Sequence, residues 1–282
     1  MLDNLSSGFE RNLNPKALFF KTDLCDPGLD EVFHDFKPEA VNHHAAQTSV
    51  VRSVREPAYD AKVNIMGSLN LIQKSIKHGV RKFVYACTGG ALYGEPKYLP
   101  ADEKHPIDPS SPYGLSKHMV EHYLNLYGEN EGLNWVSLRY ANVYGSRQNP
   151  KGEAGVVAIF ALQMLQGKPC TIFGKGDKTR DYVHISDIVR LNLLAMDNPG
   201  KTHYNAGSGL ETTDQEMFDT LAELLGYDEK AIYGPVRKGE VYRICLSSAK
   251  AQEELGWRPE VRLKEGLQKT VGFYRELAKG SP

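Results

Sequence analysis

The chain has 282 residues, of which 34 are basic and 35 acidic, for a formal net charge of -1. It contains no dense block of Lys and Arg, which argues against a nucleic acid or an acidic membrane as partner. The four cysteines are widely spaced without a CxxC pair, and no apolar run approaches the ~18 residues of a membrane span, so we expect free thiols, no metal site and a cytoplasmic protein.

Short apolar runs alternate with longer amphipathic segments along the first half of the chain. The patterns predict strands over 39–46, 82–88 and 134–145, and helices over 60–79 and 113–132. Such alternation indicates the α/β class, with a Rossmann-like, doubly wound parallel sheet covered by helices on both faces. Ligands of such sheets bind beyond the carboxyl ends of the strands.

The composition changes after about residue 146, where Gly, Pro and polar residues surround a single apolar helix. A further helix (187–196) and strand (202–208) are predicted to return to the first lobe. We therefore expect one lobe from residues 1–145 and 180–207, and a smaller lobe from residues 146–179 and 208–282.

The segment "SPYGLSK" places Tyr113 four residues ahead of Lys117. In a helix these positions share a face, so the ammonium can lie near the phenol. Upstream, "CTGGALYGE" follows an apolar strand and offers the Thr88 hydroxyl beside two glycines, where a ligand can approach the backbone closely. A Tyr-x-x-x-Lys spacing alone is weak evidence, because Tyr and Lys are common on surface helices.

A longer ordered set of segments carries a family resemblance. It comprises "LDNLSSG", "NHHAAQTSV", "VNIMGSLNL", "TGGALYGE", "SPYGLSK", "LRYANVYG", "GEAGVVAIF", "IFGKGDKTRDYVH" and "KAQEELGW". This set resembles the extended short-chain dehydrogenase/reductase family, and within it the NAD-dependent nucleotide-sugar epimerases of the UDP-glucose 4-epimerase type. The resemblance implies an NAD-binding first lobe, a nucleotide-sugar-binding second lobe and a homodimer formed through the helices at 60–79 and 113–132.

The resemblance also implies a reaction. Tyr113 is expected to be the acid/base, with Lys117 and the nicotinamide ring lowering its pKa toward the working pH. Thr88 is expected to hydrogen-bond the reacting sugar hydroxyl. The proton leaves the 4-hydroxyl of a UDP-hexose while the C4 hydride passes to NAD, and the resulting 4-keto sugar takes the hydride back on its other face.

The same resemblance assigns ligand-binding positions. Asp3 is expected to bind the adenosine ribose of NAD. The remaining cofactor-binding candidates are Asn4, Ser6, Ser7, Gly8, Asp23, Leu24, Ala45, Ala46, Gln47, Asn64 and Tyr140, together with Tyr113 and Lys117. The candidates for binding the UDP-sugar are Thr88, Asn142, Val156, Phe173, Arg180, Arg237 and Glu240, with Arg243 a weaker one.

Two histidine-containing stretches suggest metal ligands but have simpler interpretations. His43 and His44 are neighbours on a predicted strand and point to opposite faces, so packing or loop hydrogen bonding is expected. In "HISD", we expect Asp187 to cap a helix that begins near it.

The glycine fingerprint that binds the pyrophosphate of a dinucleotide does not occur in this sequence, since "GKGDKT" and "GSGLET" both lack the third glycine. We expect the first βα unit of the fold to be lacking with it. Two further hypotheses stay open: a catalytically inactive nucleotide-sugar-binding remnant, and a related dehydratase, for which the Asp-Glu pair expected after Thr88 is not found.

Overall fold

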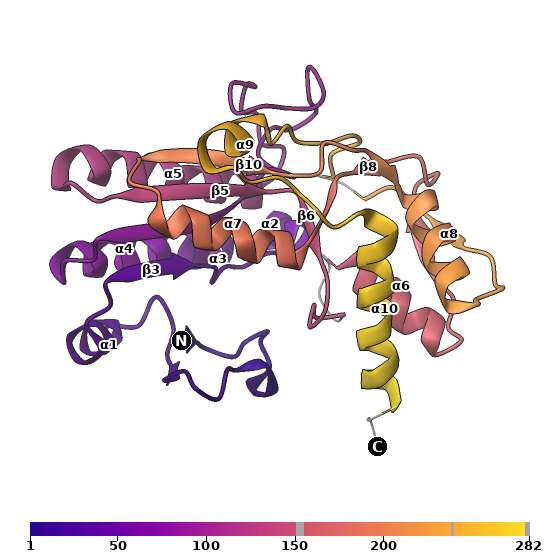
Figure 1. Cartoon of the computed structure of the whole chain (residues 1–282), viewed down its shortest axis with the longest axis horizontal. Helices are drawn as coiled ribbons and strands as arrows, with labels where there is room; N and C mark the ends of the chain where they lie inside the picture. Colours follow the sequence, from indigo (N-terminus) through magenta and orange to yellow (C-terminus); the bar gives the residue numbers. More distant parts are fainter. Residues whose placement is uncertain (151–154, 238–239, 280–282) are drawn as a thin grey trace.

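The computed structural model describes residues 1–150, 155–237 and 240–279. Its centre is a parallel sheet in the order β10 (Thr202–Ala206), β5 (Trp135–Tyr140), β4 (Lys82–Thr88) and β3 (Ala40–His43). A separate parallel pair, β1 (Leu2–Asp3) and β2 (Phe20–Lys21), lies near the β3 side of this sheet (Figure 1). The predicted α/β class and Rossmann-like parallel sheet are confirmed.

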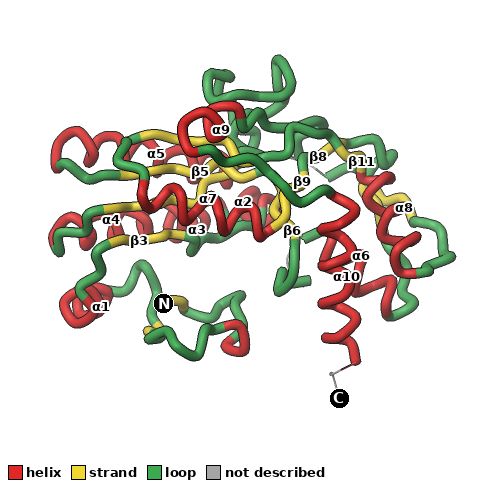
Figure 2. The backbone as a smooth tube through the Cα atoms, viewed as in Figure 1, coloured by secondary structure: helices red, strands yellow, loops and turns green. Residues whose placement is uncertain are grey.

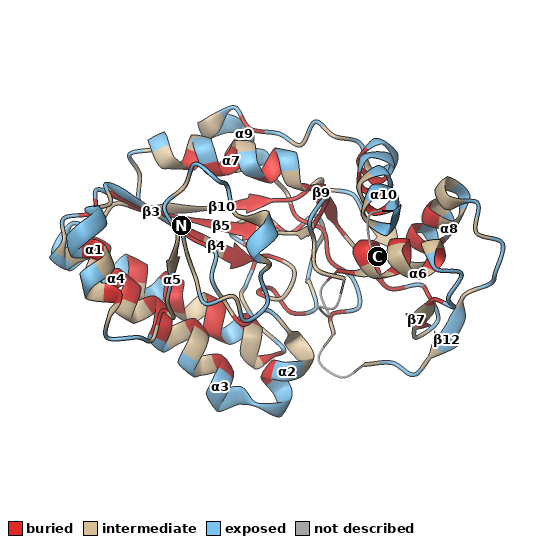
Figure 3. Ribbon diagram, turned by 90° about the horizontal axis from the view of Figure 1, so that it is seen from below, coloured by how far each residue is buried: buried red, intermediate tan, exposed pale blue. Residues whose placement is uncertain are grey.

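Helices cover both faces of the sheet (Figure 3). One face carries α2 (Val50–Arg55), α3 (Pro57–Ala61), the π-helical turn η2 (Lys62–Met66), α4 (Gly67–Lys77) and α5 (Pro112–Glu131). The other carries α7 (Ile185–Asp197) and α9 (Ala249–Leu255). The short helices η1 (Glu10–Asn12) and α1 (Leu29–Phe36) precede β3. None of the described helices is both long and apolar enough to cross a membrane.

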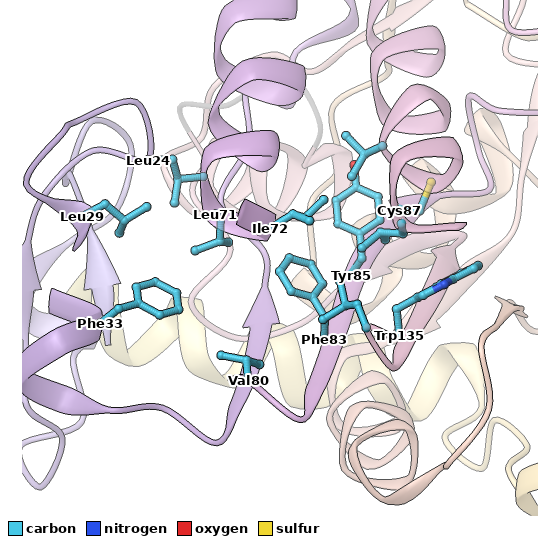
Figure 4. Close-up of a cluster of buried hydrophobic side chains, with 13 residues drawn as sticks. Leu24, Leu29, Phe33, Leu71, Ile72, Val80, Phe83, Tyr85, Cys87 and Trp135 are labelled. Carbon is cyan, nitrogen blue, oxygen red and sulfur yellow. The ribbon is translucent and has the colours of Figure 1, made fainter. Parts of the chain in front are cut away.

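Each face of the sheet has its own apolar core, because side chains alternate along a strand. Phe83 and Tyr85 of β4 point toward α4 and α5, where they join Ile72 and Trp135 in the cluster of Figure 4. Val84, between them, belongs to the opposite cluster, which also contains residues of β5, α7 and β10. Burial on both faces explains why β4 reads as an unbroken apolar run in the sequence.

Among the described residues, three packed helices and two short strand pairs form the second lobe, and a third pair lies between it and the main sheet; Figure 2 shows their arrangement. The helices are α6 (Val156–Leu165), α8 (Asp214–Leu225) and α10 (Leu263–Lys279). The pairs join β7 (Thr171–Phe173) to β12 (Ile232–Gly234), β8 (Thr179–Arg180) to β11 (Thr212–Thr213), and β6 (Asn142–Tyr144) to β9 (Tyr182–His184).

Three expectations from the sequence need correction. The helix predicted over 60–79 is divided, because the backbone changes to a π-helical turn at η2 before α4 begins. The assignment of all residues from 208 onward to the second lobe does not hold for α9. This helix contacts β10, and the following Trp257 is fully buried among the side chains of the main sheet.

The third correction concerns Asp187, which does not cap α7. The cap is His184, whose side chain accepts a hydrogen bond from the amide of Ser186. Asp187 instead lies in the first turn, where its carboxylate accepts the amides of Glu260 and Val261, each at 3.1 Å. It thereby fixes the segment that follows Trp257.

Candidate active site

The predicted catalytic residues meet at the carboxyl end of β4. Thr88 ends that strand, and Tyr113 occupies the first turn of α5, where Ser111 caps the helix by accepting the amide of Gly114. The Thr88 hydroxyl is close enough to the Tyr113 phenol to favour the phenolate and so to act against the rise in the Tyr113 pKa. The Thr88 oxygen also accepts the amide of Ala91 at 3.2 Å, which holds the loop after β4 against the strand end.

Gly114 permits this meeting because the helix start and the loop are in very close contact. A Cβ atom added at Gly114 would stand 2.3 Å from the carbonyl oxygen of Ala91 and 3.0 Å from Cβ of Pro109. Cβ atoms do not approach a carbonyl oxygen so closely, so any side chain here would push Tyr113 and Thr88 apart. Gly114 is a positioning residue that motif matching did not single out.

Lys117 follows one turn later and is buried, with 3% of its surface exposed. Its ammonium lies 4.3 Å from the centre of the Tyr85 ring, a distance suited to a cation–π interaction. Burial lowers the pKa of Lys117 to about 8, against the opposing influence of Cys87, Glu121 and Asp60. The buried Lys117 ammonium is therefore stabilised by its cation–π interaction with the Tyr85 ring.

The ionisation of Tyr113 differs from the expectation. Among the protein's own groups burial dominates and raises the pKa of Tyr113 well above its ordinary value near 10, although the hydrogen bond from Thr88 favours the phenolate. The sequence interpretation combined Lys117 and the nicotinamide in lowering this pKa. The side chains of the protein do not lower the pKa of Tyr113 by themselves. Burial disfavours the charged phenolate more strongly than the neighbouring side chains favour it.

A buried polar network supports the start of α5. The side-chain amide of Asn64 donates to Ser116 of α5 at 3.1 Å and to Asp60 at 3.1 Å. Its side-chain oxygen accepts the backbone amide of Gln47 at 2.8 Å. The Gln47 side chain in turn donates to Asp60 at 2.7 Å. The side chains of Asn64 and Gln47 are engaged within the protein, which supports the structural alternative for Asn64; a cofactor contact of either residue stays a prediction.

The N-terminal candidates form a loop after β1. The Asp3 carboxylate accepts the amide of Leu5 at 2.6 Å, and a Cβ atom added at Gly8 would lie 3.4 Å from both its oxygens. Asn4 donates to Asp23 at 2.7 Å, which brings these two predicted residues together. Ser6, Ser7 and Gly8 are exposed in this loop. Leu24 is 93% buried at the edge of the apolar core, and its contact with the adenine stays a prediction.

The residues after β3 lie beside Tyr140 at the end of β5. Ala45 is exposed and Ala46 partly exposed, and both leave the backbone accessible. His44 lies 3.2 Å from the side-chain oxygen of Asn192, whose amide nitrogen donates to the Tyr140 hydroxyl at 2.7 Å. His43 points the other way and bonds to Ser68 at 2.8 Å. The two histidines thus hydrogen-bond on opposite faces, as the strand geometry requires.

The second lobe brings together three of the predicted UDP-sugar residues. The Arg237 guanidinium stacks on the Phe173 ring at 3.6 Å and lies 3.8 Å from Glu240. Glu240 also forms an ion pair with Lys178, whose side chain is only 5% exposed. An aromatic ring, a guanidinium and a paired carboxylate suit a base, a diphosphate and a ribose, respectively. Lys178 was not predicted, although it stands in the quoted "GKGDKTRDY" segment.

The remaining predicted UDP-sugar residues lie outside this cluster. Arg180 donates to the carbonyl of Thr179 at 2.7 Å and stays half-exposed. Asn142 begins β6, and its side-chain oxygen would lie 3.5 Å from a Cβ atom at Gly90, so it borders the Thr88 loop. Val156 begins α6 and is half-buried. Arg243 forms a two-pronged ion pair with Glu211 at 2.9 and 2.6 Å, which leaves it the weakest candidate.

Asp181 connects the two lobes and was missed at the sequence level. Its buried carboxylate accepts the amides of Ser208, Gly209 and Leu246 at 2.7, 3.1 and 3.0 Å, and the Ser208 hydroxyl at 2.6 Å. Burial raises its pKa despite these donors. Asp181 thus ties the loop after β10 to the segment before α9. In the sequence, Asp181 is marked only by its position between Arg180 and the apolar strand that follows, and this position does not indicate that it joins the two lobes.

Comparisons with known proteins place this geometry in a family. Residues 1–207 match the NAD dependent epimerase/dehydratase family. The chain belongs to this family. It is 47% identical over 275 residues to a putative UDP-glucose 4-epimerase of Methanocaldococcus jannaschii, covering 98% of this chain and 90% of that protein.

Two crystal structures are closely similar to this member of the epimerase/dehydratase family. One is UDP-glucose 4-epimerase of Thermotoga maritima with UDP-glucose, at 50% identity and a TM-score of 0.96. The other is UDP-glucose 4-epimerase of Thermus thermophilus in complex with NAD, at 44% identity and a TM-score of 0.94. The matches cover 98% and 97% of this chain and 90% of each of those chains.

The family implies NAD, and the residues present fit parts of it. Gly8 has no side chain beside the Asp3 carboxylate, so the carboxylate stays open to a ribose. Tyr113 and Lys117 provide the groups expected at the nicotinamide end. The residues that the structure describes contain neither G-x-G-x-x-G nor G-x-x-G-x-x-G. No described group of three or more His, Cys, Asp or Glu could hold a metal ion.

Proposed function

We propose that this chain is an NAD-dependent epimerase that interconverts UDP-glucose and UDP-galactose by inverting C4. The placement of Thr88 at the end of β4 beside the buried Tyr113 of α5, with Lys117 one helical turn away, is the observation that carries the proposal. The names of the similar proteins from Methanocaldococcus, Thermotoga and Thermus support the choice of substrate.

The protein's residues bind the substrate at both ends. The Phe173 ring, the Arg237 guanidinium and the Glu240 carboxylate lie together, and they are expected to bind the nucleotide and its ribose. Arg180 and Asn142 are expected to offer donors to the diphosphate, and Asn142 lies beside the loop that follows Thr88. The sugar is thereby expected to reach the carboxyl end of β4, where Thr88 and Tyr113 lie.

At that position Tyr113 moves the proton. As a phenolate it accepts the proton of the sugar 4-hydroxyl, with Thr88 hydrogen-bonded to both groups, and it returns the proton once the sugar has turned over. NAD, when bound, supplies the chemistry of taking the C4 hydride and giving it back. Because burial raises the pKa of Tyr113, the phenolate depends on the charge of Lys117 and on a positive charge brought by the cofactor.

The loop after β4 favours epimerisation over dehydration. Gly89 and Gly90 follow Thr88, and a Cβ atom at Gly89 would stand 2.3 Å from Cδ1 of Leu246. Neither position carries the acidic side chain expected in a dehydratase. The loop thus offers no second acid/base beside Thr88.

Two measurements test the proposal. Calorimetry with NAD, and separately with UDP-glucose, asks which ligands the chain binds; an epimerase binds both, whereas an inactive remnant binds only the UDP-sugar. A coupled assay then follows the conversion of UDP-galactose to UDP-glucose. Tyr113→Phe is expected to lower kcat by about 10²- to 10⁴-fold with a small change in KM. Binding of NAD without any interconversion would exclude this choice of substrate.

The oligomeric state belongs to the same proposal. Tyr59, Met66, Leu115 and Leu126 are large apolar residues of α3, η2 and α5 with 37 to 60% of their surface exposed. They suit a homodimer in which these helices pack against those of a second copy. Sedimentation is expected to give a dimer, and Leu115→Glu with Leu126→Glu a monomer; a monomeric wild type would refute this part. Four free thiols fit the expected cytoplasmic location.

A further inference from the structure

Two histidines on α5 lie outside the machinery described so far. His118 and His122 are one turn apart, and their Nε2 atoms are 3.1 Å from each other. His122 is exposed, and the His118 side chain is 19% exposed. Histidines at i and i+4 on one face of a helix form a recurrent pair of metal ligands.

The nitrogen separation suits a metal ion. With Zn–N bonds of about 2.0 to 2.1 Å and tetrahedral angles, two coordinated nitrogens stand about 3.3 Å apart. A small rotation of the exposed His122 ring closes the difference from 3.1 Å. The ion would replace the hydrogen bond between the two rings and lie to one side of the line that joins their Nε2 atoms.

The orientation of His118 is already fixed as a metal ligand requires. Its Nδ1 lies 3.0 Å from Oε2 of Glu121, so Nδ1 carries the hydrogen and Nε2 presents its lone pair. Glu121 is itself held by Arg139 at 2.8 and 2.9 Å and by Ser137 at 2.7 Å. A carboxylate that accepts the second ring nitrogen is the usual partner of a ligating histidine.

We propose that His118 and His122 together bind one divalent first-row transition-metal ion through their Nε2 atoms. The site has two protein ligands, consistent with the absence of larger ligand groups among the described residues, and water completes the coordination. Imidazole pairs suit Zn²⁺, Ni²⁺ and Cu²⁺, with Cu²⁺ bound most tightly of the three.

The sequence His-Met-Val-Glu-His has the spacing found in some metallopeptidases, where the glutamate acts as a base. That role does not apply, because Glu121 is 95% buried and paired with Arg139. The ion is therefore bound without hydrolytic chemistry, and clamps one turn of the helix that also carries Tyr113 and Lys117.

The proposed metal site lies beside the proposed dimer face. On α5, Ser116 contacts η2 and Tyr127 contacts α4, so both lie on the side of the helix that packs against the protein. Each residue turns the helix by about 100°, which places His118, two residues after Ser116, on nearly the opposite side. The exposed apolar residues Leu115 and Leu126 lie between these two flanks. The histidines are thus at the edge of that face.

Titration of chelator-treated full-length protein with ZnCl₂, NiCl₂ and CuCl₂, followed by calorimetry, tests the proposal. We expect binding in the order Cu²⁺ above Ni²⁺ and Zn²⁺, and at least about a 10-fold loss of affinity for His122→Ala and for His118→Ala. His34→Ala is the matched control, because His34 is an exposed histidine next to an acid elsewhere on the surface, and it is expected to leave affinity unchanged.

Circular dichroism confirms folding of each variant, and the exposed position of His122 makes its variant the safer one. Glu121→Gln, if folded, is expected to weaken binding by about 10- to 100-fold. Equal affinity of His122→Ala and wild type, or loss of binding in His34→Ala, would overturn the proposal. Absorption spectra with Co²⁺ provide a second readout that is independent of heat.

Discussion

Lys117 is predicted to lower the free energy of unfolding, because its charge, which is proposed to favour the Tyr113 phenolate, is buried. It is almost fully buried, and among the residues that the structure describes no carboxylate forms an ion pair with it. Its pKa falls from 10.5 to about 8, which corresponds to about 3 kcal/mol of destabilisation at pH 7. The cation–π contact with Tyr85 returns about 1 to 2 kcal/mol. Lys117→Met, similar in length but uncharged, is therefore expected to raise the free energy of unfolding by about 1 to 2 kcal/mol.

The pH dependence separates this explanation from simple repacking. Between pH 8 and 10.5 the unfolded chain holds the Lys117 proton more tightly than the folded one, so wild-type stability rises with pH across that window. The advantage of Lys117→Met should be present below pH 8 and vanish by about pH 10.5. Urea denaturation at pH 7 and pH 10.5 measures it, and the coupled assay should show lost activity at both.

Lys82 is the matched control for this experiment. Burial lowers its pKa to about 8 as well, but its ammonium donates to Asn134 at 3.0 Å and to the carbonyl of Asn198. Lys82→Met leaves these acceptors without a donor and is expected to destabilise the protein. A Lys117→Met variant less stable than wild type at pH 7 would refute the argument.

Three other predictions follow from single contacts. Gly114→Ala is expected to cost about 1 to 3 kcal/mol of stability and about 100-fold in kcat by displacing Tyr113. Gly272→Ala, in open space on α10, should leave activity unchanged and raise stability by about 0.5 to 1 kcal/mol in denaturation. Hydrogen bonds from His118, Arg139 and Ser137 hold the pKa of Glu121 low despite burial, so the stability that ionised Glu121 contributes is lost as pH falls below about 4.5. Glu121→Gln should lower the free energy of unfolding by about 3 to 5 kcal/mol at pH 7, and urea denaturation should show a weaker loss of stability in acid. Arg237→Ala should weaken UDP binding by about 10- to 100-fold in calorimetry, whereas Arg81→Ala, on the far surface, should not.

The sequence was sufficient for the parts of the fold and site that depend on local periodicity. Buried parallel strands appear as apolar runs, so β4 and β5 were found at their correct places. The i, i+4 spacing placed Tyr113 and Lys117 on one helix, and the strand end placed Thr88 near them. Each of these inferences needs only the geometry of one element and the rule that parallel strands end at one edge.

What could not be predicted depends on tertiary contacts. Asn64 and Gln47 resemble ligand-binding residues in sequence, but only the packing of η2 against α5 shows that each satisfies the other and Asp60. The sequence ranks Arg243 below Arg237 but does not show that Arg243 is paired with Glu211, which is 32 residues away in the chain. Trp257 joins the main sheet because α9 crosses back to it, which no periodicity reveals.

The loop after β4 is held by both lobes, and this links the UDP-sugar residues to the acid/base. Its start is fixed by Thr88 and by the contact of Gly114 with Ala91. Its middle is joined to the second lobe, where the carboxylate of Glu95 accepts the amide of Tyr242. The carbonyl of Tyr242 in turn accepts the amide of Thr179, beside Lys178 and its partner Glu240. A substrate that displaces Lys178 or Arg237 from Glu240 therefore acts on the loop that positions Thr88, so loss of Arg237 should lower kcat as well as affinity.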